Sequence, residues 1–396
     1  MDATTFNNSK LLATAEKKNQ EVLVENDDIA SFFAETPVIV WAEAAANFQR
    51  LGTAERMSNV FQKIIDAGIT GIIIDVKGIH GLVNYDSKIA NQLKEWDGNT
   101  QALDFDYLKN AILEGKKKGL KVFVSISTFA EGLEHNGVKL GKVFNDPEFE
   151  AIQSCVATET GEIKRITDVY SYGLINPLHP KSQEYELSLI KEIVVNYDID
   201  GFVLDYCRYY EICADFSEYS LSKFKEWANL QNLAITDIVQ EWEMNTNGIP
   251  YPKIPGPQYR KWLEFRALTI RKFVEDARKE VKSIKPNLPF CSYAGAWYDS
   301  YYTVGVNWRS ETYDPYLDGY SSWATPKYKR TGYAEQIDMF ITGNYTPHLT
   351  GNGWWTVQGQ LSGTKKVLKE ANIQYGAINI GNTEWKSPAD MGTAIS

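Results

Sequence analysis

The sequence predicts an α/β fold, a (β/α)8 TIM barrel, formed by residues 37–396. Apolar segments with strand character alternate along the chain with segments of helical character, which is the pattern of a parallel sheet. Residues 202–204 are apolar without polar alternation, as expected of a strand covered on both faces. A length of 396 residues is compatible with one barrel that carries insertions. We therefore expect one barrel domain.

The first β/α unit sets the pattern for the others. Residues 37–43 are expected to form a strand, and residues 53–68 a helix whose apolar side chains recur at helical spacing and whose C-cap is Gly68. Seven such strands are recognised, at residues 37–43, 69–76, 120–126, 199–205, 288–293, 337–343 and 374–380. Six helices are expected, at residues 53–68, 105–118, 180–197, 217–230, 259–285 and 359–371.

Three further segments interrupt or flank this alternation. Residues 127–176 are too long for an ordinary connection and are expected to fold over the barrel mouth. Residues 248–257 are expected to form a Pro-rich loop, and the polar residues 1–36 an arm that packs on the outside. No eighth strand is recognised before Ser396, so we expect a barrel that is open or truncated. The chain end favours truncation, with the arm covering part of the gap.

Charge and hydropathy exclude several classes of partner. The formal net charge is −10, which argues against binding to nucleic acid or to anionic membranes. No apolar stretch approaches the roughly 20 residues of a membrane span. The first residues do not have the basic and apolar blocks of a signal peptide. We expect a mature secreted, periplasmic or surface-anchored form that lacks its signal peptide, with a cytoplasmic location as the alternative.

The cysteines and histidines do not predict a metal site. Four cysteines and four histidines are spread along the chain without the spacing of zinc ligands. Free thiols are the expected state, with a disulfide between Cys207 and Cys213 as the alternative. We expect neither a metal nor another cofactor.

Three motifs resemble one known family. They are N-P-L-H-P at residues 176–180, Y-D-I-D-G-F-V-L-D-Y-C-R-Y at residues 197–209, and I-D-V-K-G at residues 74–78. Together these motifs resemble the family-10-like glycosyl hydrolases. The resemblance covers roughly residues 37–380. It implies a TIM barrel with glycosidase chemistry, distantly related to the α-amylase group, and it does not imply a particular sugar.

Charged residues at the predicted strand ends are the candidate catalytic groups. Hydrolysis of a glycosidic bond usually needs two carboxyl groups, one as acid and one as nucleophile or base. Asp205 ends the fourth strand, where the resemblance places the nucleophile, and Arg208 is expected to keep it ionised. The alternative is a salt bridge between these two residues at the barrel rim. Asp75 and Lys77 are expected to face the mouth, as a substrate clamp or an ion pair.

Two residues compete for the role of the acid. Asp299 follows the fifth strand, where the resemblance places the acid, although the α-amylase-like enzymes use Glu there. Glu384 follows the seventh strand and is the competitor. Asp299 can instead cap a turn. Glu43, after the first strand, is expected to bind a sugar hydroxyl.

Aromatic side chains in the predicted loops are expected to bind sugar rings. The chain has 11 Trp and 23 Tyr, many of them in these loops. Together with two polar residues, the candidates for substrate binding are Tyr206, Arg208, Trp297, Tyr298, Trp308, Asn344 and Tyr345. Tyr301, Tyr302, Trp354 and Trp355 add to the aromatic density around them.

These observations favour a glycoside hydrolase that acts on an oligo- or polysaccharide. The main alternative is a barrel that has lost its acid and binds carbohydrate without cleaving it. A lyase or esterase is the third hypothesis, and it is weaker because the sequence has neither a Gly-x-Ser-x-Gly motif nor a phosphate-binding glycine loop.

Overall fold

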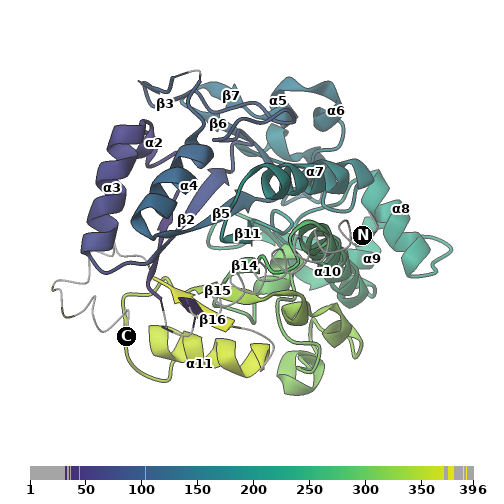
Figure 1. Ribbon diagram of the computed structural model, residues 1–396. Coiled ribbons are helices and arrows are strands. Elements are labelled where there is room, and N and C mark those ends of the chain that lie inside the picture. The colour runs from purple at the N-terminus through teal and green to yellow at the C-terminus, as the bar shows by residue number, and fades with distance from the viewer. Residues whose placement is uncertain are drawn as a thin grey trace, which may run out of the picture.

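The computed structural model describes residues 32–33, 35, 37–43, 45–102, 104–369, 373–378, 387 and 389. Its centre is a curled seven-stranded sheet in which every neighbouring pair is parallel (Figure 1). In pairing order the strands are β1 (Ile39–Ala42), β2 (Gly71–Lys77), β5 (Lys121–Ser127), β11 (Gly201–Asp205), β14 (Phe290–Gly295), β15 (Met339–Gly343) and β16 (Ile373–Ala377). The two edges are β1 and β16, so this sheet is an incomplete barrel. The predicted fold class and the seven strands are confirmed.

Helices cover the outer face of the sheet (Figure 1). The six longest are α3 (Ala54–Asp66), α4 (Tyr107–Lys118), α7 (Pro180–Asn196), α8 (Glu218–Trp227), α10 (Tyr259–Ile284) and α11 (Val357–Leu368). Local sequence explains their ends: Thr53 caps α3 by accepting the Arg56 N–H, and α4 ends at Gly119, whose φ of 72° favours glycine. All six correspond to predicted helices.

One connection departs from the alternation of strands and helices. Residues 296–338, between β14 and β15, are described throughout and contain short 3-10 and π turns but no α-helix. Pro315 and Pro326, with Gly305 and Gly319 at positive φ, interrupt any regular helix there. This connection carries many of the aromatic residues that the sequence associates with sugar binding.

The two faces of the sheet are both apolar, which explains the continuous apolar runs in the sequence. The inner face contributes one cluster of buried side chains: Ile73, Phe123, Val203, Cys291, Met339 and Ile341. Alternate residues, such as Ile72, Val124 and Leu204, join the larger cluster that packs against the helices. Because side chains alternate with period two, Asp75 and Asp205 continue the inner face at the carboxyl ends of their strands.

The end of the predicted arm enters the barrel. Phe32 and Phe33 pack against Phe123 of the inner cluster, with ring centroids 6.1 and 6.2 Å from it. Phe33 also contacts Tyr375 on the edge strand β16. The expectation that the arm packs on the outside is not met by these two residues, whose apolar rings pack against the inner cluster and are partly buried there. Residues 1–31 lie outside the described residues.

The long segment after β5 forms a small structure of its own. It contains a three-stranded antiparallel sheet of β6 (Ala130–His135), β7 (Val138–Leu140) and β10 (Tyr172–Leu174). It also contains α5 (Lys142–Asn145), α6 (Pro147–Glu150), β8 (Cys155–Ala157) and β9 (Ile163–Arg165). This segment starts at the carboxyl end of β5, as predicted, and contacts α7 through Glu131 and Glu186 near Lys77. Its role as a lid stays a prediction.

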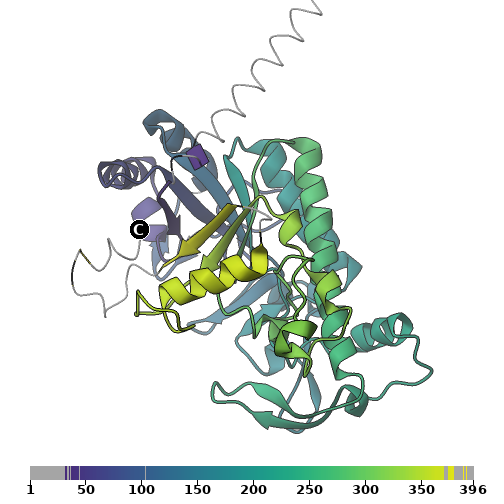
Figure 2. The ribbon, with the colours of Figure 1, turned by 90° about the horizontal axis from the view of Figure 1, so that it is seen from below.

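A second cluster of buried side chains lies beside the barrel. Phe216, Phe224, Trp242 and Trp262 are among its members. Trp242 comes from a hairpin of β12 (Val239–Met244) and β13 (Pro250–Pro255), seen in Figure 2 at the edge of the molecule away from α3 and α4. The Pro-rich loop expected at residues 248–257 is therefore mostly a strand. Proline is tolerated because both strands of a two-stranded sheet are edge strands.

Candidate active site

Asp205 is held at the carboxyl end of β11 by its backbone neighbours. Its carbonyl accepts the Thr128 N–H at 2.7 Å, and its Oδ1 accepts the Tyr206 N–H at 2.7 Å. Tyr206 has a φ of 50°, a conformation that is uncommon for tyrosine and turns the chain sharply after the carboxylate. The local backbone thus fixes the direction of the Asp205 side chain at the barrel rim.

Burial controls the protonation of Asp205. It raises the pKa of this carboxyl group to about 6, although the Tyr206 N–H and the charge of Arg208 act in the opposite direction. The expectation that Arg208 holds Asp205 ionised is therefore only partly met, since desolvation exceeds the attraction of the guanidinium. The ion pair of Arg208 is with Glu211, at 3.9 Å, rather than with Asp205, and its guanidinium lies over the Tyr206 ring at 4.6 Å.

Asp75 is the second carboxyl group of the site. Its side chain is 5% exposed, and its pKa is raised well above the ordinary value, first by burial and then by the negative charges of Asp205 and Glu43. The charge and backbone N–H of Lys77 act in the opposite direction. Burial and the two negative charges therefore favour the protonated form of Asp75. Because the charge of Asp205 acts on Asp75, the two carboxyl groups are electrostatic neighbours.

Two polar atoms beside this pair have no partner. Asp75 Oδ1 and the Tyr107 hydroxyl are buried without a hydrogen bond among the residues that the structure describes. Burial raises the pKa of Tyr107, and the charges of Asp75 and Glu43 raise it further, so the three groups are close together. Both atoms can therefore form a hydrogen bond with a bound molecule. Glu43 itself is exposed and accepts the backbone N–H groups of Ala45 and Ala46 at 3.1 and 2.6 Å.

Tyrosines surround Asp205 on the other side. Tyr293 on β14 donates a hydrogen bond of 2.6 Å to the hydroxyl of Tyr345. The charge of Asp205 contributes to the raised pKa of Tyr293, Tyr301 and Tyr345, after burial in each case. Trp41 packs edge-on against Tyr293, with ring centroids 5.3 Å apart. Tyr345 is 55% exposed, so this aromatic wall reaches the surface.

Sequence reasoning missed Trp41, Tyr293 and Tyr107 as site residues. A signal for two of them was available: Trp41 and Tyr293 each follow an inner-face residue, Ile39 or Cys291, by two positions. The same spacing relates Val203 to Asp205. Tyr107 starts α4 and had no comparable signal.

Lys77 does not face the site. The pairing of β2 with β5 shifts register between Asp75 and Lys77, so the two side chains diverge. The ammonium of Lys77 is fully buried 2.7 Å from Glu131 and 3.2 Å from Glu186, and it donates to the Ser127 carbonyl at 2.8 Å. Of the two expectations, the substrate clamp is excluded for Lys77 in this structure. Lys77 does form ion pairs, but its partners are Glu131 and Glu186 and not Asp75.

Two further candidates are buried in the core. Trp308 is 1% exposed and packs against Phe340, with ring centroids 5.3 Å apart. Asn344 is fully buried and donates to Gln360 at 3.3 Å. Neither side chain can touch a sugar in this structure, because each is enclosed by protein. The expectation that they bind substrate is therefore not met.

The remaining candidates lie on the loop after β14 or beyond the described residues. Trp297 is 42% exposed and lies beside Tyr301, with ring centroids 6.1 Å apart. Tyr298 is half-buried beneath the Arg309 guanidinium. Asp299 is exposed, and its charge acts on Tyr320 rather than on Asp75 or Asp205. Glu384 lies outside the described residues.

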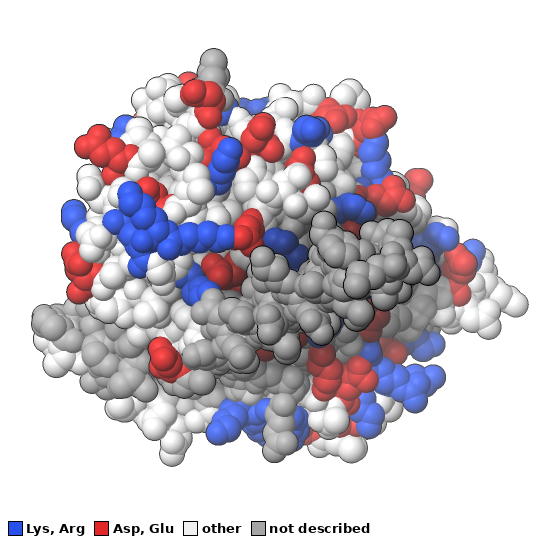
Figure 3. Space-filling view, viewed as in Figure 1, with Lys and Arg blue, Asp and Glu red and all other residues white. Residues whose placement is uncertain are grey.

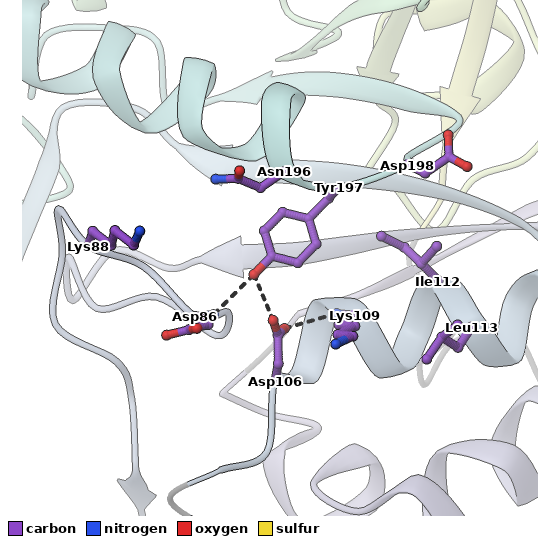
Figure 4. Close-up of a pocket in the computed structure, with 9 residues that line it drawn as sticks. All are labelled: Asp86, Lys88, Asp106, Lys109, Ile112, Leu113, Asn196, Tyr197 and Asp198. Carbon is purple, nitrogen blue, oxygen red and sulfur yellow. Dashed lines mark hydrogen bonds between the residues drawn. The ribbon is translucent and has the colours of Figure 1, made fainter.

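A hollow of about 370 Å³ lies elsewhere, between α4 and the end of α7. Figure 4 shows Tyr197 at its centre, donating to Asp106 at 2.7 Å and accepting the Asp86 N–H at 3.2 Å. Its charged side chains have both signs, and neither Asp75 nor Asp205 lines it. We do not place the site in this hollow, because none of its carboxyl groups lies at the carboxyl end of a strand of the seven-stranded sheet.

Within the described residues, no group of three or more His, Cys, Asp or Glu side chains is arranged to hold a metal ion. All four cysteines are free thiols, so Cys207 and Cys213 are not bridged. No described helix is long and apolar enough to cross a membrane. Figure 3 shows basic and acidic side chains interspersed on the face that it presents.

Comparisons with known proteins complement this geometry. The profile of the family described as Glycosyl hydrolase-like 10 matches residues 35–327. An S-layer-related protein of Niallia circulans is 30% identical over 325 residues, which are 78% of this chain and 20% of that protein. The chain thus spans about a fifth of the length of this curated relative. The PgaB (BpsB) glycoside hydrolase domain of Bordetella bronchiseptica matches with a TM-score of 0.53 at 12% identity, over 91% of this chain and 99% of that domain, which shows a shared fold.

Proposed function

Because this chain belongs to the glycosyl hydrolase-like 10 family, we propose that it is a glycoside hydrolase that cleaves an oligo- or polysaccharide with the carboxyl groups of Asp205 and Asp75. The observation that carries the proposal is their coupling: the charge of Asp205 raises the pKa of Asp75 at the carboxyl ends of two barrel strands. Catalytic groups of TIM-barrel enzymes lie at this end. Paired carboxyl groups are also what glycoside hydrolysis needs.

The environments of the two carboxyl groups support a division of roles. Asp75, whose pKa is raised by burial and by the charges of Asp205 and Glu43, is proposed as the acid that protonates the leaving oxygen. Asp205, with a pKa of about 6, is mostly ionised at neutral pH and acts as nucleophile or base. The proton on Asp75 is retained because a second negative charge beside Asp205 would be costly in a buried site.

Asp299 and Glu384 are the other candidates for the acid. Asp299 is exposed, and its charge does not act on Asp205, which favours Asp75 over it. Glu384 is not described by the structure and stays a competitor. Activity measurements on Asp75→Asn, Asp299→Asn and Glu384→Gln distinguish the three candidates for the acid.

Aromatic and polar side chains around the pair are proposed to hold the sugar. Trp297 and Tyr345 offer exposed rings for stacking on the apolar face of a pyranose. Glu43, Tyr206 and Arg208 are proposed to bind hydroxyl groups at the rim. Trp308 and Asn344 are not included because both are enclosed by the core.

The experiment is to measure reducing ends released from neutral polysaccharides by the wild type and by Asp205→Asn. We expect the variant to lose at least about 100-fold in kcat while it still binds the polysaccharide. Asp299→Asn is the matched control, and it should keep its activity. If the wild type binds polysaccharides but releases no reducing ends, the protein is a carbohydrate-binding barrel, and the hydrolase proposal fails.

We also propose that the protein works at the cell surface. The name of the S-layer-related relative supports this location. Protease treatment of intact producing cells tests it: a surface protein is digested, whereas survival of the protein until the cells are lysed would contradict a surface location.

A further inference from the structure

Two exposed tryptophans stand on the loop between β15 and α11. Trp354 is 77% exposed and Trp355 is 55% exposed. Their ring centroids are 6.1 Å apart and their planes meet at 85°, so they present two perpendicular aromatic faces. Two large apolar side chains exposed side by side are costly in water and mark a binding site.

Hydrogen bonds fix the loop that carries these rings. Thr346 Oγ1 donates to the Trp355 carbonyl at 2.5 Å. Thr356 Oγ1 lies 2.9 and 2.8 Å from the carbonyl oxygens of Gly351 and Gly353. Both threonines are buried, at 8% and 4% exposure. The rings are therefore exposed on a backbone that hydrogen bonds hold in one conformation, which reduces the entropy lost when a ligand binds.

The loop is connected to the carboxyl pair. It begins at the carboxyl end of β15, and β15 is parallel to β2 and β11 within one sheet, so the loop lies at the same end of the barrel as Asp75 and Asp205. Tyr345 belongs to this loop and accepts the hydrogen bond of Tyr293 at 2.6 Å. The charge of Asp205 acts on both tyrosines. The tryptophan loop and the carboxyl pair thus lie at the same end of the barrel, where one extended ligand would cross both.

We propose that Trp354 and Trp355 form a separate sugar-binding subsite for an uncharged polysaccharide, next to the point of cleavage. This inference rests on the proposed function. Pyranose rings have apolar faces that stack on indole rings. The carboxyl groups of Glu43 and Asp205, which both act on Asp75 at the proposed point of cleavage, would repel uronates and sulfated sugars, so we expect a ligand without acidic groups. The subsite favours polymers over short oligosaccharides, which cannot reach the tryptophans and the point of cleavage at the same time.

The test compares wild type, the double variant Trp354→Ala/Trp355→Ala, and Trp354→Phe/Trp355→Phe. Reducing-end assays and native affinity gels use soluble starch, laminarin and galactan, their di- and trisaccharides, and polygalacturonate as the acidic probe. We expect the alanine variant to raise KM for one of the neutral polymers about tenfold, with kcat unchanged. The phenylalanine variant should retain most of the affinity. Leu317→Ala, at a residue that is 79% exposed on another loop, is the matched surface control.

The outcomes separate this inference from the proposed function. If the wild type cleaves a neutral polymer and the alanine variant has the same KM, the subsite is wrong and the hydrolase proposal stands. Equal losses on polymer and trisaccharide would also overturn the subsite, because they would show that the loop shapes the reacting site. A lowered melting temperature without a change in KM would show that the rings pack against the chain itself. If the wild type neither binds nor cleaves any neutral polymer, both proposals fail.

Discussion

The negative charge of Asp205 raises the pKa of Asp75, although β5 separates their strands in the sheet. Burial raises the pKa of both carboxyl groups and is the largest cause for each. The charge of Asp205 further favours a proton on Asp75. This relationship determines the predicted pH dependence.

Activity is expected to depend on pH with a bell shape. On the acid side, kcat/KM rises as Asp205 ionises and is half-maximal near pH 6. On the alkaline side, it falls when Asp75 loses its proton, because the leaving oxygen is then no longer protonated. Initial rates at low substrate concentration from pH 4 to pH 10 check this, with enzyme stability verified at each pH. A rate that only falls as pH rises through 6 would contradict the assignment of Asp205 as base.

Replacement of Lys77 by methionine should destabilise the protein, although Lys77 does not face the proposed substrate site. Lys77 is fully buried between Glu131 and Glu186, so its removal leaves two buried carboxyl groups without a counterion. We expect a loss of about 3–5 kcal/mol in the free energy of unfolding. Urea denaturation measures it, and Lys88→Met, at an exposed lysine, is the control. A loss equal to that of the control would show that the cluster does not hold the barrel together.

The same cluster should make stability depend on pH. Burial raises the pKa of Glu131 from 4.5 to about 8, while Lys77 and Lys142 act in the opposite direction. A carboxyl group with a raised pKa in the folded state stabilises fully below pH 4.5, and this contribution is lost as pH rises through about 8. Glu131→Gln mimics the protonated form, so its stability relative to wild type should increase from pH 6 to pH 8. Glu134→Gln, on the exposed face of β6, should show no such change.

Trp308 and Trp297 should respond in opposite ways to replacement by alanine. Trp308 is enclosed, so Trp308→Ala should cost about 3–5 kcal/mol of stability. Trp297 is 42% exposed, and Trp297→Ala should cost about 1 kcal/mol or less but raise KM. Thermal unfolding and steady-state kinetics on the same preparations separate the two effects. A Trp308→Ala variant with wild-type stability and a raised KM would show that Trp308 binds substrate.

Sequence reasoning succeeded where local patterns determine structure. The unbroken apolar run before Asp205 correctly predicted a strand buried on both faces. The family resemblance is confirmed by the match over residues 35–327. Predicted strand bounds differ by up to two or three residues from the observed ones, as for β14 (Phe290–Gly295) against residues 288–293.

Errors arose where tertiary contacts override local pattern. Lys77 was placed on the open face because a β-bulge after Asp75 has no signal in the spacing of side chains. Trp308 was placed at the mouth because the 296–338 connection, which has no helical periodicity, gives no sign that its residues fold back on the core. The sequence singled out both Asp75 and Asp205 but gave Asp75 the role of a clamp or ion-pair partner, because raised pKa values depend on burial and on charges from other strands.

The measurement that tests the central claim most directly compares leaving groups. Asp75→Asn and Asp205→Asn are assayed on the natural glycan and on the 2,4-dinitrophenyl glycoside of the sugar that wild type releases. The dinitrophenolate leaves without protonation, so Asp75→Asn should lose at least about 100-fold on the glycan but retain near wild-type cleavage of the activated glycoside. Asp205→Asn should be inactive on both. Full activity of Asp75→Asn on the glycan, or equal losses on both substrates, would contradict the assignment of Asp75 as the acid beside Asp205.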